Sequence, residues 1–283
     1  MPAEDGAGGS PGRPEAKDGI EDLERLEGAV VALGSAVVAY SGGADSALVA
    51  YMCRRVLGRE KSLAVTAVSP SLAPEELEDC RDFAARYDLD WRGVDTDELS
   101  RAAYRRNDPD RCYHCKSALM DVLEPLATGR QATVVLGVNL DDLDEHRPGQ
   151  RAAAERGARF PLVEASMTKA AVRALSRRLS LPSADKPQAA CLASRVPYGT
   201  EVTVEVLSRV QRAESALRRL GFASLRVRHY GDAARIELPL LELSRAIELR
   251  DDLVAGVRQA GYRYVTLDLE GLRSGNLNSA IRN

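Results

Sequence analysis

The sequence lacks an apolar run long enough to cross a membrane, because a stretch such as residues 29–40 falls short of the roughly 20 apolar residues that a spanning helix needs. Its amino terminus also lacks the basic and then apolar pattern of a secretory signal. Positive charge is not in excess: 39 Lys and Arg stand against 42 Asp and Glu, for a formal net charge of -3 and a pI of about 5.8. A long polyanion would therefore meet no attractive overall field. We expect a soluble cytoplasmic protein that acts on a small molecule, without a membrane or nucleic-acid partner.

Cysteines are few, at positions 53, 80, 112, 115 and 191, and their odd number in a chain without an export signal disfavours a disulfide framework. Cys53 and Cys80 lie within apolar helical patterns, so we interpret them as small buried hydrophobic residues. The other three occur in motifs that suggest chemistry.

Composition and periodicity divide the 283 residues into three parts. Residues 1–18 are rich in Gly, Pro, Ala and charge and poor in apolar surface, so we predict a disordered leader. Over residues 19–190 short apolar runs alternate with amphipathic helical patterns, which is typical of a parallel sheet with helices on both faces. The predicted strands are residues 36–40, 63–69, 90–94 and 132–138. Helices are expected to start near Asp45, Pro74, Asp97, Arg111 and Thr168, with Thr168 as an N-cap.

The pattern changes after the Pro-containing stretch at residues 187–199. Residues 191–283 are predicted to contain a helix, two strands, a second helix and a final strand, at residues 204–220, 225–230, 234–238, 241–260 and 262–269. This order predicts a small α+β domain. We expect that domain to bind substrate and to contribute to oligomerisation.

Residues 41–46 read Ser-Gly-Gly-Ala-Asp-Ser and join the first predicted strand to a predicted helix. Gly42 and Gly43 allow backbone conformations closed to other residues, and free N–H groups at the helix start form a nest for phosphate oxygens. Ser41 and Ser46 add hydroxyl groups. Asp45 would repel phosphate unless a divalent cation bridged them, so its presence suggests Mg²⁺. The alternative is an ordinary Gly-Gly turn that a side chain caps.

The loop has no following lysine of the kind that serves kinase-type transfer. It resembles the PP-loop of ATP pyrophosphatases, which implies an adenine nucleotide alpha hydrolase-like fold and cleavage of ATP between the alpha and beta phosphates. The resemblance further implies that the substrate is adenylated and pyrophosphate is released. A nitrogen or sulfur nucleophile can then displace AMP.

Cys112 and Cys115 open a predicted helix, and their C-x-x-C spacing puts both sulfurs on one side of its first turn. Two thiolates leave a metal or iron-sulfur cluster short of ligands, and Cys191 is the other cysteine in a loop context. Three cysteines would hold a [4Fe-4S] cluster with one open iron. Two buried core cysteines are the alternative for the pair.

Cys191 lies in the segment Lys-Pro-Gln-Ala-Ala-Cys-Leu-Ala-Ser-Arg-Val-Pro-Tyr-Gly-Thr at residues 186–200, whose prolines and glycine indicate a loop. Arg195 and Lys186 would stabilise a thiolate at Cys191 and make it a nucleophile toward an activated carboxyl carbon. A buried structural cysteine is the alternative.

Five motifs together resemble the LarE family of PP-loop sulfur transferases over roughly residues 20–280. They are SGGADS, the D-R-C-x-x-C-K run, N-L-D-D-L with R-P-G, the Cys191 segment and the C-terminal T-L-D-L-E-G-x-R-S-G-x-L-N string. The resemblance implies that ATP adenylates a carboxylate of pyridinium-3,5-dicarboxylic acid mononucleotide and that sulfur replaces oxygen, on the route to the nickel-pincer nucleotide of lactate racemase. It implies that Cys191 carries the sulfur and is sacrificed in some members, whereas cysteines at 112 and 115 imply a cluster-bound sulfide. A hexamer is also implied.

Other candidate site residues are predicted from their positions relative to the expected strands. Asn139 and Asp141 or Asp142 come just after a predicted strand end, where ligands gather in open α/β sheets, and are candidates to contact nucleotide or metal. Arg226 and Arg228 are two apart on one strand and so face one side, suited to a substrate phosphate, with Ser194 and Arg195 opposite. The alternative for the two arginines is a solvated strand face. Glu214 is a candidate base or metal ligand, but the sequence alone favours a surface salt bridge for it.

Three rival functions remain open. A tRNA-thiolating PP-loop enzyme with a [4Fe-4S] cluster would also combine a C-x-x-C with a third cysteine, although the acidic pI disfavours it. An amide-forming ligase of the NAD synthetase type would need no cysteine. A nucleotide-binding regulator would release no pyrophosphate.

Overall fold

The computed structural model describes residues 15–143, 148–186 and 190–273, with side chains from residue 19 onward. Its first domain is built on a four-stranded parallel sheet in the order β3-β2-β1-β4. The strands are β1 (Ala36–Ala39), β2 (Ser62–Val68), β3 (Asp90–Asp95) and β4 (Thr133–Leu136). All four predicted strands are therefore confirmed, with their ends within two residues of the predicted bounds.

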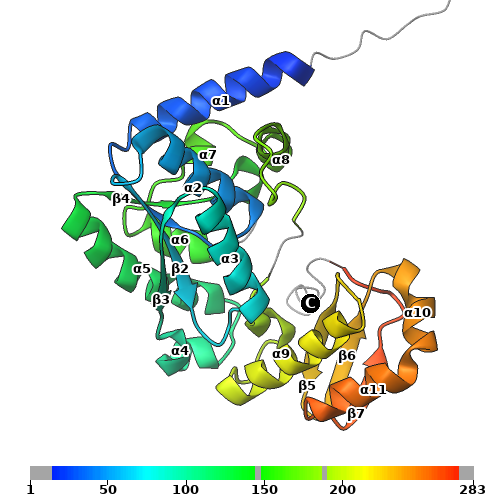
Figure 1. The fold of residues 1–283 in the computed structure, drawn as a ribbon. Helices are drawn as coiled ribbons and strands as arrows, with labels where there is room; N and C mark the ends of the chain where they lie inside the picture. Colours follow the sequence, from blue (N-terminus) through cyan, green and yellow to red (C-terminus); the bar gives the residue numbers. More distant parts are fainter. Residues whose placement is uncertain (1–14, 144–147, 187–189, 274–283) are drawn as a thin grey trace, which may run out of the picture.

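Helices cover both faces of this sheet, as predicted (Figure 1). Alternate residues of β1 supply the two faces, since Val38 packs in one core cluster and Val37 in the other. One face carries α1 (Glu15–Val31), α2 (Ala44–Leu57), α3 (Pro74–Arg86), α7 (Pro161–Glu164) and α8 (Lys169–Arg178). The other carries α5 (Arg111–Arg130) and α6 (Pro148–Ala154). Thr168 caps α8 by accepting a hydrogen bond from the Ala171 N–H (3.2 Å), which confirms its predicted role.

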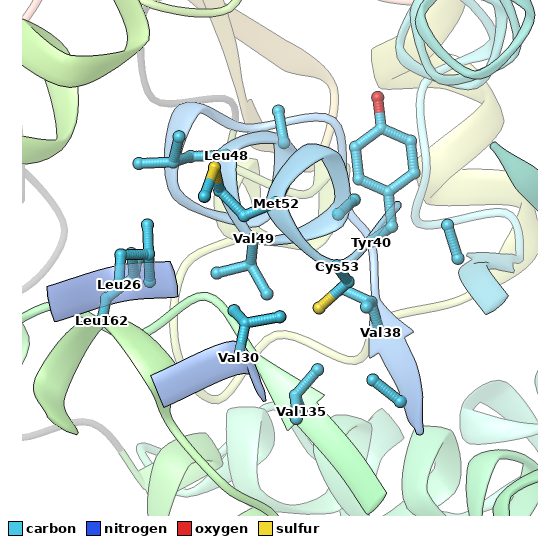
Figure 2. Close-up of a cluster of buried hydrophobic side chains, with 14 of the residues drawn as sticks. Leu26, Val30, Val38, Tyr40, Leu48, Val49, Met52, Cys53, Val135 and Leu162 are labelled. Atoms are coloured by element: carbon cyan, nitrogen blue, oxygen red, sulfur yellow. The ribbon is translucent and has the colours of Figure 1, made fainter. Parts of the chain in front are cut away.

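The core between α1, α2 and the sheet is closely packed, and Figure 2 shows the side chains of Leu26, Val30, Met52 and Cys53 gathered there. Cys53 has no exposed surface, and its burial raises the pKa of the thiol to about 12. Cys80 is equally buried. Both cysteines are thus the buried residues that the sequence predicts.

The second domain has a mixed sheet in the order β5-β6-β7, with β5 (Arg226–Tyr230) antiparallel to β6 (Ala233–Glu237) and β6 parallel to β7 (Tyr264–Leu267). One face packs against α9 (Val204–Arg219) and α11 (Arg250–Gln259) around Leu217, Val227 and Val257. Helix α9 also contributes Leu207 and Val210 to a smaller cluster with Tyr104 and Leu192, so it joins the two domains. The predicted small α+β domain is confirmed.

Three local predictions need correction. The predicted helix at residues 241–260 is divided into η4 (Leu240–Glu242), α10 (Leu243–Glu248) and α11, because Leu249 leaves the helical conformation before Asp251 and Asp252, which favour a new helix start. The helix expected near Asp97 is only η1 (Glu98–Ser100) and α4 (Ala102–Arg105), since Asn107 is left-handed and Pro109 disfavours helix at the preceding residue.

The predicted leader boundary at residue 18 is also wrong, because α1 begins at Glu15. Its apolar residues Leu23, Leu26 and Val30 recur at helical spacing and pack on the core. Residues 1–14 lie outside the described part of the chain. None of the helices within the described ranges combines the length and apolar character of a membrane-spanning segment.

Candidate functional site

The loop at residues 41–43 leads from β1 into α2, and its two glycines differ. Gly42 has a positive φ of 75°, and a Cβ there would lie 2.8 Å from the Sγ of Cys80. Gly43 has an ordinary φ of -75°, and a Cβ there would come no closer than 3.7 Å to the Ser41 Oγ. Only Gly42 therefore needs the freedom of glycine, which refines the expectation for the pair.

The two serine hydroxyls hold the loop in shape. Ser46 Oγ accepts a hydrogen bond from the Ser41 N–H (3.2 Å), bonds the Ser41 Oγ (3.1 Å) and donates to the Gly43 carbonyl (3.1 Å). Ser46 is only 6% exposed. The residues of the loop thus fix one another before any ligand arrives.

Gly137, which sequence reasoning missed, lets the end of β4 approach the start of α2. A Cβ at Gly137 would lie 2.5 Å from the Ser46 backbone nitrogen, so no other residue fits without moving backbone. Its signal in the sequence is a glycine directly after a buried strand. This contact seats the first turn of α2 against the carboxyl end of the sheet.

Asp45 and Asn139 meet as predicted, because the Asn139 amide donates to Asp45 Oδ1 (3.2 Å). Asp45 also forms an ion pair with Lys169, a residue that the sequence did not single out. Asp141 and Asp142 organise the backbone there: Asp141 Oδ2 accepts from the Lys169 N–H (2.8 Å), and Asp142 Oδ2 accepts from the Asn139 N–H (3.2 Å). Asp45 and Asn139 thus meet at the start of α2, and Asp141 and Asp142 bind the backbone of their neighbours Lys169 and Asn139.

Lys186 lies on the other side of the loop. Its Nζ is 3.7 Å from the position of a Gly42 Cβ and pairs with Glu76 (2.7 Å) and Asp79 (2.8 Å) of α3. Burial lowers the pKa of Lys186, but the hydrogen bonds and negative charges of these two carboxylates outweigh it. The pKa of Lys186 is therefore raised. Its ion pairs and its approach to Gly42 therefore place this charge at the phosphate loop, whereas the sequence assigned it to Cys191.

The three remaining cysteines gather in one region. Cys112 and Cys115 stand in the first turn of α5, and Cys191 precedes η3 (Leu192–Arg195). Burial raises the pKa of Cys115 to about 12, and the next largest cause is the charge of Cys191. Cys112 and Cys191 are exposed, while Cys115 is half-buried beside Leu99 and Leu192.

The thiols therefore lie in one region, but they are not drawn into a ligand set. Within residues 15–143, 148–186 and 190–273, no three or more His, Cys, Asp or Glu side chains are grouped closely enough to hold a metal ion. The predicted cluster ligands stay a prediction.

The Cys191 loop lies at the same edge of the sheet as the phosphate loop. The Leu192 N–H donates to the Ser71 carbonyl (2.9 Å), and Ser71 follows the carboxyl end of β2, the strand beside β1. Ser71 Oγ in turn bonds the Tyr104 hydroxyl (2.6 Å). Parallel strands thus place an exposed thiol and the phosphate loop at one edge.

Glu214 is deeply buried, so the expected surface salt bridge is wrong in its location. Its carboxylate pairs with Arg195 (2.8 Å) and Arg218 (3.1 Å) and accepts a hydrogen bond from the Val227 N–H (3.1 Å). Arg195 also donates to the Ala190 carbonyl (2.6 Å), directly before Cys191. The pair therefore anchors the Cys191 loop to the second domain.

Arg226 and Arg228 share one side of β5 with Arg195, as the spacing predicts. Burial, then the charges of Arg228 and Arg195, lower the pKa of Arg226. Arg228 is 3% exposed and donates to the Ser194 carbonyl (2.7 Å) while pairing with Glu237 (2.9 Å). Arg226 has no ion pair among the described residues, and its Nη1 donates to the Arg273 carbonyl (3.0 Å). This side of β5 is positively charged.

A parallel sheet whose first strand passes through Ser-Gly-Gly-Ala-Asp-Ser into a helix defines the nucleotide-binding domain of PP-loop enzymes. The NAD synthase family model matches residues 24–119, the part that contains this loop. A pyridinium-3,5-bisthiocarboxylic acid mononucleotide synthase of Lactiplantibacillus plantarum is 38% identical over 263 residues, which are 93% of this chain and 92% of that protein. The chain therefore belongs to the LarE-like family within the NAD synthase and PP-loop superfamily, whose LarE synthases are ATP-dependent enzymes.

Two further relatives show how far the similarity extends. An uncharacterized protein of Synechocystis is 48% identical over 262 residues, which are 92% of this chain and 97% of that protein. An NH(3)-dependent NAD(+) synthetase of Methanococcoides burtonii is 36% identical over only 98 residues, 34% of this chain and 36% of that protein. The likeness to NAD synthetase is thus limited to a part of the chain, whereas the likeness to the LarE-like relative extends over nearly the whole of both chains.

Proposed function

We propose that this protein uses ATP to adenylate a carboxylate of pyridinium-3,5-dicarboxylic acid mononucleotide and then replaces oxygen by sulfur, for synthesis of a nickel-pincer cofactor. The observation that carries the proposal is the position of the exposed Cys191 loop at the sheet edge that also holds the phosphate loop. The synthase of Lactiplantibacillus plantarum, similar over nearly its whole length, supports the substrate class.

The first step needs the phosphate loop. Free N–H groups at the start of α2, with Gly42 giving close approach, bind the phosphates of ATP, and Ser41, Gly43 and Ser46 keep the loop in shape. A substrate carboxylate oxygen attacks the alpha phosphorus and pyrophosphate leaves. Lys169 and Lys186 supply positive charge for the departing group. The carboxylate of Asp45 is suited to Mg²⁺, with Asn139, Asp141 and Asp142 holding the strand end beside it.

The second step needs a sulfur. Cys191 is exposed and attached through Leu192 to the same edge, so its sulfur is the candidate nucleophile toward the acyl adenylate. Its attack on the acyl carbon forms an acyl–sulfur bond and releases AMP. Removal of the Cα proton of Cys191 by a base, with cleavage of its Cβ–S bond, would then leave the sulfur on the substrate as a thiocarboxylate and dehydroalanine at position 191. Glu214 holds the loop through Arg195 and has no free carboxylate oxygen for a base, so we assign it a positioning role.

The alternative sulfur source is a [4Fe-4S] cluster. The thiols of Cys112, Cys115 and Cys191 would hold it, since thiolate sulfurs are the ligands of such a group and the three lie in one region. When bound, the cluster would supply a sulfide on its open iron. Assembly would draw the Cys191 loop closer to α5.

The substrate phosphate is assigned to the positive side of β5. Arg226 has no ion pair among the described residues, and Arg228, Arg195 and Ser194 surround the same place. Charge-assisted hydrogen bonds contribute about 1.5 to 3 kcal/mol each, enough to hold a small anion. Assembly into a hexamer, which the resemblance to the family implies, is tested by light scattering of the eluting protein.

The decisive experiment supplies ATP and the mononucleotide and measures pyrophosphate, AMP and thiocarboxylate together. Wild type should form all three, and Cys191→Ala should still release pyrophosphate but form no thiocarboxylate. An amide-forming ligase would instead use ammonia and ignore the substitution. Binding of tRNA in a gel shift would favour the tRNA-thiolating alternative.

Two measurements, iron-sulfur reconstitution and the intact mass of the protein, distinguish the two sulfur sources. Anaerobic reconstitution with iron and sulfide should colour wild type but not Cys112→Ala if the cluster is the donor. Loss of the Cys191 sulfur in the intact mass after turnover would identify the sacrificial route instead.

A further inference from the structure

Asn107 forms hydrogen bonds with the part of the Cys191 loop that follows the cysteine, at residues 196–200. The residue is fully buried and left-handed, with φ of 59°, and its amide nitrogen donates to the carbonyls of Val196 (3.3 Å), Pro197 (2.8 Å) and Thr200 (3.0 Å). An amide has two N–H groups for these three acceptors, so one proton is shared. The Asn107 carbonyl also accepts a hydrogen bond from the Gly199 N–H (3.2 Å).

Arg111 joins this contact to the C-x-x-C helix. It is the first residue of α5, directly before Cys112, and only 5% exposed. Its Nη1 donates to the Asn107 side-chain oxygen and to the Ala193 carbonyl (2.9 Å), two residues after Cys191. One guanidinium therefore spans from the helix that carries Cys112 to the loop that carries Cys191.

The charge of Arg111 has no carboxylate partner among the described residues. A buried arginine without a counter-ion is costly, so a negative partner must be sought nearby. The groups whose charges act on Arg111 are Cys191 and Cys112, followed by the hydroxyl groups of Tyr104 and Tyr198. The guanidinium therefore lies near the thiols of Cys191 and Cys112, and 6.0 Å from the centre of the Tyr198 ring.

We propose that Asn107 and Arg111 form a positioning unit that holds the Cys191 loop at the start of α5, beside the Cys112–Cys115 pair. The attachment of the loop to the start of α5 stands on the hydrogen bonds alone. Its consequence for catalysis rests on the proposed function.

The rest of the loop has separate supports. Arg195 and Arg228 attach it to the second domain, and the Val202 N–H donates to the Arg105 carbonyl (2.9 Å). Removing the positioning unit should therefore leave the fold intact while the three sulfurs lose their alignment.

The test titrates phenylarsine oxide, a trivalent arsenical that binds two neighbouring thiols, into the reduced full-length protein. Wild type should bind it, and Cys191→Ala and Cys112→Ala should show which pair is used. Asn107→Gly keeps the left-handed backbone but removes the amide, and Arg111→Met removes the charge. Each should weaken arsenical binding ~10-fold, the effect of losing one or two hydrogen bonds.

Arg106→Met is the matched control, because Arg106 is exposed on the same turn and pairs only with Asp108 (3.3 Å) among the described residues. It should bind the arsenical as wild type does. Arg111→Lys, which keeps the charge but cannot span both partners, should fall between wild type and Arg111→Met. Asn107→Asp retains the oxygen that Arg111 uses and loses the N–H donors, so it provides the same test if a larger change fails to fold.

Unchanged arsenical affinity in Asn107→Gly, Asn107→Asp and Arg111→Met would overturn the proposal. Catalysis gives a second readout: the KM for ATP and pyrophosphate release should stay near wild type while thiocarboxylate formed per AMP falls. A protein that never makes thiocarboxylate but loses arsenical binding in the variants would refute the proposed function and leave the positioning unit standing.

Discussion

The phosphate loop (residues 41–46) and the cysteine group (Cys112, Cys115 and Cys191) lie at one edge of one sheet, but they are built in different ways. The phosphate loop is six consecutive residues that hydrogen-bond among themselves, mainly through Ser41 and Ser46. The cysteine group joins α5 to a loop far along the chain through side chains such as Asn107 and Arg195. A contiguous loop carries its own geometry, whereas a group assembled from distant segments depends on the hydrogen bonds between them.

The largest effect is expected where the cysteine group depends on a buried charge. Glu214→Gln should lower the free energy of unfolding by about 3 kcal/mol or more, because it leaves Arg195 and Arg218 without their buried partner. Urea unfolding measures the change. The exposed pair of Glu205 with Arg209 offers the control, and Glu205→Gln should cost less than about 0.5 kcal/mol. Equal losses in the two variants would contradict the distinction.

The phosphate loop should be most sensitive where other backbone presses on it. Gly137→Ala places a Cβ 2.5 Å from the Ser46 nitrogen and should destabilise the protein by about 2 kcal/mol, with loss of ATP binding in calorimetry. Gly129, inside α5, has nothing within 4 Å of its Cβ position. Gly129→Ala should therefore stabilise slightly, by up to about 1 kcal/mol. If both substitutions changed the stability in the same direction, the close contact at Gly137 would be unimportant.

Substitutions at the two glycines of the phosphate loop should have different effects on stability and ATP binding. Gly42→Ala should cost about 1 to 2 kcal/mol and weaken ATP binding, because it forces a residue with a Cβ into the left-handed region beside Cys80. Gly43→Ala should change stability by less than about 0.5 kcal/mol, since its φ is ordinary. Thermal unfolding and ATP titration of both variants measure the difference, and similar behaviour would mean that the loop changes shape on binding.

The smallest effect concerns pH and the second domain. Burial, then Arg209, lower the pKa of His229 from its ordinary value of 6.5, so the unfolded chain binds the proton more readily than the folded one. The contribution to stability is present above that value and is lost as the pH falls below it. His229→Gln should flatten this slope, which urea unfolding at several pH values measures. An unchanged slope in His229→Gln would contradict the assignment.

The arrangement of the first domain could be predicted because its signals are local. Alternating apolar runs placed all four strands, and Gly-Gly between a strand and a helix placed the phosphate loop. Lys169 could not be predicted, because only the packing of α8 beside α2 brings it to Asp45. Glu214 was mistaken for a surface residue, since its partner Arg195 comes from the loop that precedes α9.

The sequence by itself determined the elements that short-range patterns encode: the strands, most of the helix starts and the glycine loop between β1 and α2. Only the tertiary structure decided that the Cys191 loop is attached to the start of α5, which buried charges hold it, and that it shares an edge with the phosphate loop. The reason is physical. Backbone conformation follows from neighbouring residues, whereas the pairing of buried charges depends on which distant segments the packing brings together.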